Sequence, residues 1–219
     1  MAIEYTVRRS TRARRVRVSV DPQAGVQVTL PARAREREAE LADAVLRPWI
    51  ERRLAELAAA RERLALPSGH VPYLGGPVRL APEAGRVRAH RRGDVLHVPD
   101  EAEARRAALE RWYRRAARAE IEPRLRAATG ALGRDFTRLT IREQRTRWGS
   151  CSASGAMSFN WRLLLGPEAV LDYVVWHEAC HLVVMDHSRR FWALLERHVP
   201  GYRAPQRWLR ANGAALVLP

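Results

Sequence analysis

The sequence predicts an α+β fold in which a small helix-centred domain follows an N-terminal subdomain of a β-hairpin and helices. Three observations support this class. Residues 5–30 alternate between apolar and polar side chains, residues 101–129 have a helical spacing of apolar residues, and an apolar segment begins at residue 167. The length of 219 residues fits one large domain or two small ones. A shift in composition near residue 100 predicts a basic, β-rich and helical subdomain over 1–100 and a second domain over 101–219.

Residues 5–30 have the pattern of a β-hairpin. Valine occupies positions 16, 18 and 20 with arginine or serine between, and Val26, Val28 and Leu30 resume the alternation. The Asp-Pro-Gln-Ala-Gly sequence at 21–25 is typical of a turn between two such arms. The first arm is crowded with arginine, at Arg8, Arg9, Arg12, Arg14, Arg15 and Arg17.

Residues 33–64 are rich in Ala, Arg, Glu and Leu, as helices are. Pro48 interrupts this run and predicts either a kink or two helices, because proline lacks the N–H that an interior helical residue donates. The side chains expected to face inward are Leu41, Val45, Trp49, Leu54 and Leu57. Residues 66–100 are rich in Pro and Gly and predict short strands at 78–80, 86–89 and 95–98.

The second half alternates between helices and strands. Residues 101–129 predict a long helix that Gly130 and Gly133 end, with Ala108, Trp112, Ala116, Ala119 and Ile121 inward. Strands are expected at 136–142 and 157–161, and helices at 167–184, 188–198 and 203–213.

Composition narrows the class of protein. The net charge is +15, and every basic residue is arginine. Residues 1–150 hold 32 arginines and 19 acidic residues, so nonspecific attraction of this half to polyanions is expected. The absence of lysine favours a general compositional bias as the source of the arginines. Two cysteines, no apolar leader and no long apolar span predict a cytoplasmic protein without a membrane segment.

Residues 177–181 read His-Glu-Ala-Cys-His, which is the HExxH pattern. On a helix, residues four apart share a face, so His177 and His181 can hold one metal ion. Glu178 can then act as general base on a metal-bound water. The start signal Gly166-Pro167 and the apolar residues that follow it support a helix here.

His187 lies six residues after His181 and offers a third ligand just beyond the helix. A catalytic zinc site takes three protein ligands and leaves a further position open. We therefore expect one metal ion per chain, held by His177, His181 and His187. Histidine also binds other divalent metals, so these three residues predict the position of the site more firmly than the identity of the metal.

The segment from Arg147 to Trp192 resembles the YgjP-like metal-dependent hydrolases, a family related to SprT-like and other small zincin peptidases. The matching pieces are Arg-Trp-Gly-Ser-Cys at 147–151, Asn-Trp-Arg-Leu at 160–163, Pro167, Tyr-Val-Val at 173–175, the HExxH string, His-Ser at 187–188 and Phe-Trp at 191–192. The resemblance implies a zincin-like metallopeptidase domain and zinc as the metal.

Two further residues are candidates for the site because they belong to these matching pieces. The resemblance places residues 157–161 on an edge strand that pairs with an extended substrate. Asn160 would then touch the substrate, support a metal ligand, or tie down a loop. Arg147 would stabilise an oxyanion, bind a phosphate, or form a packing corner.

Three functions are compatible with these residues. The first is a zinc-dependent metallopeptidase that acts on a peptide or protein and uses Glu178 to activate water. The second is hydrolysis of a nucleotide phosphoanhydride, of the nucleoside triphosphate pyrophosphatase type, which the arginine-rich half and Arg147 suggest. The third is a nucleic-acid-associated protein that carries a zincin domain.

Overall fold

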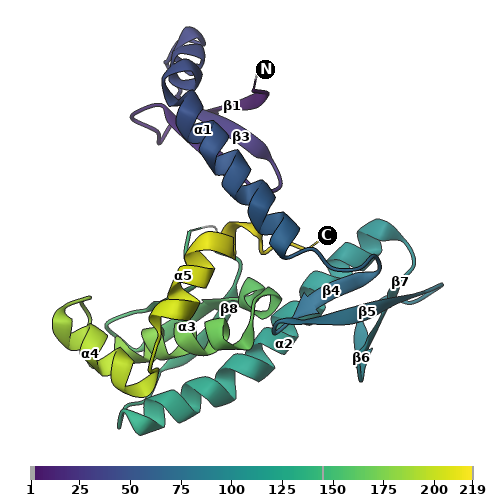
Figure 1. Ribbon diagram of the computed structural model, residues 1–219, viewed down its shortest axis with the longest axis vertical. Coiled ribbons are helices and arrows are strands. Elements are labelled where there is room, and N and C mark those ends of the chain that lie inside the picture. The colour runs from purple at the N-terminus through teal and green to yellow at the C-terminus, as the bar shows by residue number, and fades with distance from the viewer. Residues whose placement is uncertain (1–2, 145, 219) are drawn as a thin grey trace. The chain divides into compact units, whose positions relative to one another are not determined.

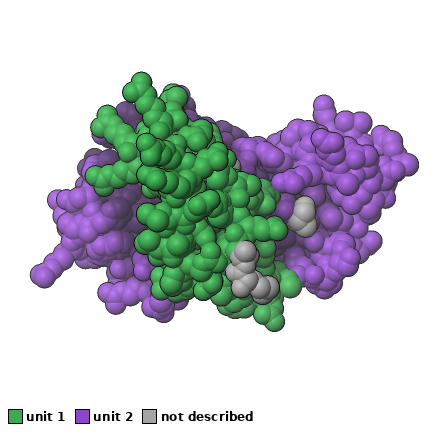
Figure 2. All heavy atoms as spheres, turned by 90° about the horizontal axis from the view of Figure 1, so that it is seen from above, with its two compact units in different colours: residues 1–65 green, residues 66–219 purple. Residues whose placement is uncertain are grey.

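A computed structural model describes residues 3–144 and 146–218 and divides the chain into two compact units. Unit 1 is Met1–Ala65 and unit 2 is Leu66–Pro219, coloured green and purple in Figure 2. The described residues form helices and three small sheets, so the α+β class is confirmed (Figure 1).

Unit 1 begins with a three-stranded sheet of β1 (Tyr5–Ser10), β2 (Arg17–Asp21) and β3 (Gly25–Pro31). The expected hairpin is confirmed, because β2 and β3 pair antiparallel with Val18 opposite Val28. The sequence pattern extended the first arm of the hairpin back to residue 5, whereas in the structure this arm is β2 alone. Residues before the 11–16 connection form β1, which pairs parallel to the other edge of β3.

The helix α1 (Arg37–Arg63) completes unit 1 and continues through Pro48, so the alternative of two helices is wrong. Its inward face also differs from the expected one. Ala39 and Ile50 are fully buried, whereas Leu41 and Val45 are 70% and 72% exposed. Ala39 packs into the cluster of β3 valine and leucine side chains, and a residue two positions further on points about 200° around the helix, away from the sheet. Leu57 is buried, as expected.

Unit 2 opens with a four-stranded sheet in the order β4-β5-β7-β6. Its strands are β4 (His70–Tyr73), β5 (Gly76–Glu83), β6 (His90–Arg92) and β7 (Val95–Pro99). The strand expected at 86–89 is wrong. Gly85, with φ of 72°, turns the chain after β5, and pairing with β7 begins again only at His90.

The helix α2 (Ala102–Ala131) runs alongside both this sheet and the helices that follow (Figure 1). The carboxylate of Glu101 caps it by accepting hydrogen bonds from the N–H groups of Glu103 and Ala104. Its buried face contains Tyr113, Ala117, Ile121 and Leu125. Ala119, which was expected to face inward, is exposed. Ala108 and Ile121 are buried, as expected.

Contact between α2 and β7 also explains where the compact units divide. Composition placed the boundary between residues 100 and 101, whereas the compact units meet at 65 and 66. The sheet of residues 70–99 packs on α2 and therefore clusters with unit 2.

A second sheet in unit 2 has the order β8-β10-β9. Its strands are β8 (Arg138–Arg142), β9 (Gly149–Cys151) and β10 (Ala156–Asn160). The remaining elements are η1 (Trp161–Leu165), α3 (Glu168–Cys180), α4 (Arg189–His198), α5 (Arg203–Asn212) and η2 (Gly213–Ala215). The α-helix expected to reach residue 184 ends at Cys180, and residues 181–183 continue as turns. Among the described residues, no helix is long and apolar enough to cross a membrane.

The face of α1 can be tested by substitution. Ile50→Ala removes a fully buried side chain and is expected to lower the free energy of unfolding by about 2–5 kcal/mol. Val45→Ala, at an exposed position of the same helix, is expected to change it by less than about 0.5 kcal/mol. Urea unfolding of the full chain measures both, and the opposite ranking would mean that Val45 faces the core.

Candidate metal centre

The candidate centre is built at the C-terminal end of α3. This helix starts directly after Pro167 and buries apolar side chains on most of its circumference, among them Leu171, Val175 and Ala179. It contacts α2, α4, α5 and β9, so its position is fixed from several sides. His177 lies in its last turn and His181 is the residue that caps its C-terminus.

The structure brings the three expected histidines together. One ring nitrogen from each of His177, His181 and His187 lies within 4.8 Å of the others. The Nε2 atoms of His177 and His187 are 3.0 Å apart. His187 reaches this position because the chain turns back after residue 184, and the carboxylate of Asp186 accepts a hydrogen bond from the Ser188 N–H before α4 begins.

The arrangement of ring nitrogens fits a metal ion. The Nδ1 atom of His181 lies 3.1 Å from the Val184 carbonyl oxygen, to which it can donate, and this leaves Nε2 as the ligand atom. At 3.0 Å, the Nε2 atoms of His177 and His187 either share an N–H···N hydrogen bond or, when neither carries a proton, can both face one cation. Nitrogens bound to one tetrahedral zinc ion are about 3.4 Å apart, given bond lengths near 2.0–2.1 Å. The distance of 3.0 Å between the Nε2 atoms of His177 and His187 is close to that value.

Burial keeps two of the candidate ligands, His177 and His181, in the form that binds metal. Burial, and then the neighbouring His181 and His187, lower the pKa of His177 to about 3. Burial also lowers the pKa of His181. A neutral imidazole has the free lone pair that a metal ion needs.

An aromatic wall surrounds the three imidazoles. The ring of Phe191 is fully buried, with its centroid 4.9, 4.6 and 4.7 Å from those of His177, His181 and His187. The ring of Trp192 stacks on His187 at 5.4 Å. These rings restrict the rotation of the imidazoles and keep water from one side of the centre.

Sequence reasoning missed two members of this wall. Tyr202 stacks on Trp192 at 5.3 Å and lies 6.3 Å from Tyr173, whose ring is 5.8 Å from His177. The signal for Tyr173 was present, since it precedes His177 by four residues and therefore lies on the same helix face. Nothing in the local sequence points to Tyr202, which α5 brings from a distance.

Glu178 lies beside the histidines and is only 7% exposed. Burial raises its pKa to about 7, while the positive charge of Arg147 acts in the opposite direction. The backbone of β9 passes directly against it. A Cβ atom on Gly149 would lie 2.5 Å from the Glu178 Cγ atom, so only glycine allows this approach.

Asn160, the last residue of β10, connects this strand to the backbone of Gln144 and Arg147. Its Nδ2 atom donates to the Gln144 carbonyl at 2.8 Å and to that of Arg147 at 3.4 Å, and its Oδ1 atom accepts from the Arg162 N–H. The side chain is 1% exposed, and none of its described hydrogen bonds reaches a histidine. Asn160 therefore fixes the backbone before β9, while the exposed Arg147 side chain acts on Glu178 through its charge.

The expected position of the substrate-pairing edge needs correction. Residues 157–161 were expected at an edge, but β10 is the central strand, paired with β8 on one side and β9 on the other. The strand that lies at the edge of this sheet and contacts α3 is β9. No local pattern predicted this strand, because Gly149–Cys151 is too short to show alternation.

The arginines near the N-terminal hairpin belong to unit 1. Arg12, Arg14, Arg15 and Arg17 are exposed and line a hollow of about 560 Å³ within unit 1, beside the connection between β1 and β2.

Comparison with known proteins identifies the family to which the chain belongs. The model of the YgjP-like metallopeptidase domain family matches residues 14–212, so the chain belongs to that family. A search of curated proteins gives no match. One solved structure, a metallopeptidase zymogen of Pyrococcus abyssi named abylysin, is 25% identical over 41% of this chain and 92% of its own, with a TM-score of 0.37. Membership of the family makes this a metallopeptidase-type hydrolase domain and implies a metal cofactor.

Metal content tests the ligand set. His177→Ala and His187→Ala are each expected to lower metal affinity by at least about 10–100-fold, because each removes a ligand. His198→Ala is the matched control, since His198 stacks on Trp176 outside the cluster and should leave affinity unchanged. Elemental analysis and titration with zinc measure the effect. If His187→Ala retained full affinity, His187 would not be a ligand.

The contact at Gly149 gives a separate prediction. Gly149→Ala places a methyl group against Glu178 and is expected to lower the free energy of unfolding by about 1–3 kcal/mol. In Gly130→Ala the new methyl group on α2 meets open space, so stability should stay equal or rise by up to about 1 kcal/mol. Thermal unfolding compares the two, and equal stability of both variants would contradict the close approach.

Proposed function

We propose that this protein is a zinc-dependent peptidase with one zinc ion per chain. His177, His181 and His187 hold the ion, and Glu178 is the general base. The observation that carries the proposal is the convergence of three imidazole nitrogens within 4.8 Å beside one buried carboxylate. Membership of a metallopeptidase family supports peptide bonds as the target.

A bound zinc ion would supply a Lewis acid that makes a water molecule more acidic and polarises the carbonyl of the substrate. Glu178 accepts the proton of that water and later donates it to the leaving amine. Because its carboxylate is buried against β9, it needs little reorganisation to do so. Arg147 holds positive charge beside this carboxylate and opposes the negative charge that builds up during the attack.

The edge of β9 gives an extended substrate a place to bind. One side of β9 pairs with β10, and the other side belongs to the sheet edge next to Glu178. A peptide that adds to this edge as a further strand would use main-chain hydrogen bonds and would pass Glu178. We propose this edge, in place of β10, as the binding strand.

Hydrolysis of unfolded protein substrates by the zinc-loaded chain tests the proposal. Glu178→Gln keeps the shape of the side chain but removes the base, and is expected to lower the rate by about 10²–10⁴-fold with zinc content unchanged. Glu196→Gln, at an exposed carboxylate of α4, is the matched control and should keep wild-type activity.

A parallel assay tests nucleotides as the alternative substrate. The same variants are incubated with nucleoside triphosphates, and released phosphate and pyrophosphate are measured. Hydrolysis of nucleotides that depends on Glu178, with no cleavage of any peptide, would replace the peptidase assignment by a phosphoanhydride hydrolase. Loss of zinc in Glu178→Gln would instead mean that the carboxylate supports the metal ligands.

A further inference from the structure

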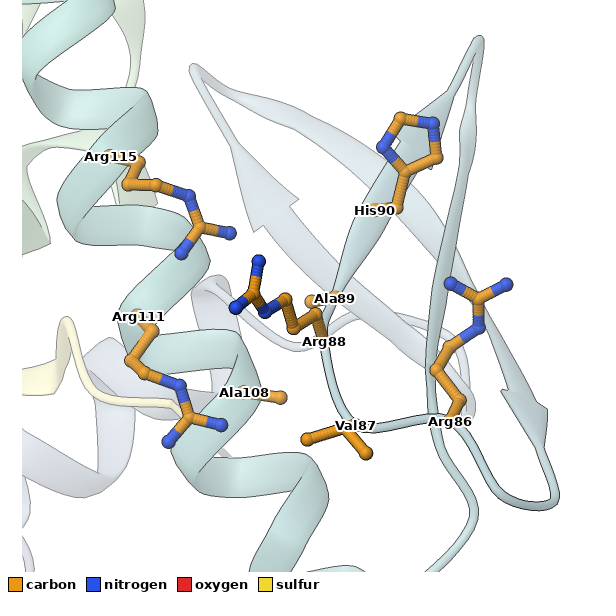
Figure 3. Close-up of a pocket in the computed structure, with 8 residues that line it drawn as sticks. All are labelled: Arg86, Val87, Arg88, Ala89, His90, Ala108, Arg111 and Arg115. Atoms are coloured by element: carbon orange, nitrogen blue, oxygen red, sulfur yellow. The ribbon is translucent and has the colours of Figure 1, made fainter.

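Unit 2 contains a second concave feature, between the loop after β5 and the N-terminal half of α2. The hollow has a volume of about 650 Å³, within the range of small-molecule sites. Figure 3 shows the guanidinium groups of Arg88, Arg111 and Arg115 directed into the space between the loop and the helix. Arg86 and His90 complete its basic lining.

The floor and the rim of the hollow are apolar and small. Ala89 of the loop and Ala108 of the helix are 4% and 1% exposed, so both short side chains are buried. Val87 is 72% exposed at the rim. Because the side chains at the floor are short, the long arginine side chains stand around an open space and do not fill it.

The three guanidinium groups that face the hollow differ from those of four other arginines on α2. Arg114, Arg118, Arg124 and Arg126 each form an ion pair with a glutamate four residues away on this helix. No described carboxylate lines the hollow, and Arg86, which also lines it, pairs with Glu83. Within the described part of the chain, no ion pair or side-chain hydrogen bond involves Arg88, Arg111 or Arg115.

We propose that this hollow binds an anion that carries two or more phosphate groups. Three guanidinium groups that face one space repel one another, and a multivalent anion between them would convert this repulsion into attraction. Each guanidinium presents a planar fork of N–H donors that matches phosphate oxygens in a bidentate manner. Three such forks carry three positive charges, more than one carboxylate or one phosphate, at about −1.5 to −2, would neutralise.

The charge density of the ligand favours phosphate over acidic side chains. A terminal phosphate carries about −1.5 to −2 charges at neutral pH, whereas a carboxylate carries one. Linked phosphates concentrate this charge within the hollow, while the carboxylates of a peptide lie on flexible side chains that must be ordered on binding. The shared chemistry is found in free oligophosphates and in the backbone of nucleic acids, and the experiment separates these two sources.

The hollow is separate from the histidine centre. Arg124, further along α2, contacts Glu168 and Asp172 of α3, the helix that carries the histidines. Arg111 and Arg115 precede it by 13 and 9 residues, which is about 20 and 14 Å along the helix axis. A ligand in the hollow therefore leaves the metal ligands free.

Binding of inorganic tripolyphosphate to the full chain, measured by calorimetry, tests the proposal. The variant Arg88→Gln/Arg111→Gln/Arg115→Gln removes the three forks. Arg106→Gln/Arg134→Gln/Arg207→Gln removes the same charge at exposed positions outside the hollow. Both variants retain the histidine centre, so any binding of tripolyphosphate to the metal contributes equally to both. Circular dichroism confirms that each variant is folded.

We expect wild type to bind about one tripolyphosphate per chain in the hollow. The first variant should weaken it by at least about tenfold, the equivalent of one lost charged hydrogen bond, and the second by less than about threefold. Equal weakening in both variants would mean nonspecific attraction to the net positive charge, and would overturn the site. If wild type bound neither tripolyphosphate nor single-stranded oligothymidylate, the site would also be overturned.

Two further probes identify the source of the phosphates. Oligothymidylate that binds more tightly than tripolyphosphate, with the same dependence on the three arginines, would support the site and assign it to a nucleic acid backbone. Oligoglutamate that binds more tightly than either, with that dependence, would overturn the phosphate assignment in favour of an acidic peptide.

Discussion

The close approach of three imidazoles at the end of a buried helix is the constraint on which the rest of unit 2 depends. The Nε2 atoms of His177 and His187 lie 3.0 Å apart, a distance at which one neutral ring can donate its N–H to the other. The apolar faces of α3 fix His177, and the turn before α4 returns His187. Phe191 then touches all three rings. A metal ion would replace this hydrogen bond by bonds to both nitrogens, so metal binding and folding stabilise the same arrangement.

The same constraint explains why Glu178, the proposed general base, is buried. Glu178 follows His177 directly, and a helix that aims one ligand at the centre also places the next residue about 100° around its axis. Here that direction faces β9. Gly149 allows the strand to approach closely, and Asn160 holds the preceding segment so that the Arg147 charge acts on the carboxylate. The carboxylate is thereby kept dry and next to an unpaired strand edge, which is the combination that a water-activating base beside an extended substrate requires.

Parts of this arrangement could be predicted from sequence because they depend on local spacing. The pairing of His177 with His181 follows from helical geometry, and the β2–β3 hairpin follows from its alternation and turn. Features set by distant contacts could not be predicted. The buried face of α1 depends on where Ala39 meets β3, and the central position of β10 depends on the short strand β9. Tyr202 joins the site only because α5 packs on α3. Local patterns therefore predicted the chemistry, whereas tertiary packing decided what surrounds it.

The arginines show which features follow from composition and which follow from position in the fold. The excess of positive charge is spread over the chain, and lysine is absent throughout, so most of it follows from composition. Structure distinguishes the arginines by their neighbours. On α2, Arg114 and Arg126 each have a glutamate one turn away, and in these pairs exposure limits the stabilisation to a few tenths of a kcal/mol, about what such pairs contribute on helices. Arg88 comes from a loop and Arg111 and Arg115 from α2, and the three face one hollow that no described carboxylate lines. A compositional bias supplies arginine everywhere, but it does not direct three guanidinium groups from two elements into one concave surface, and this convergence is what makes the hollow a candidate site.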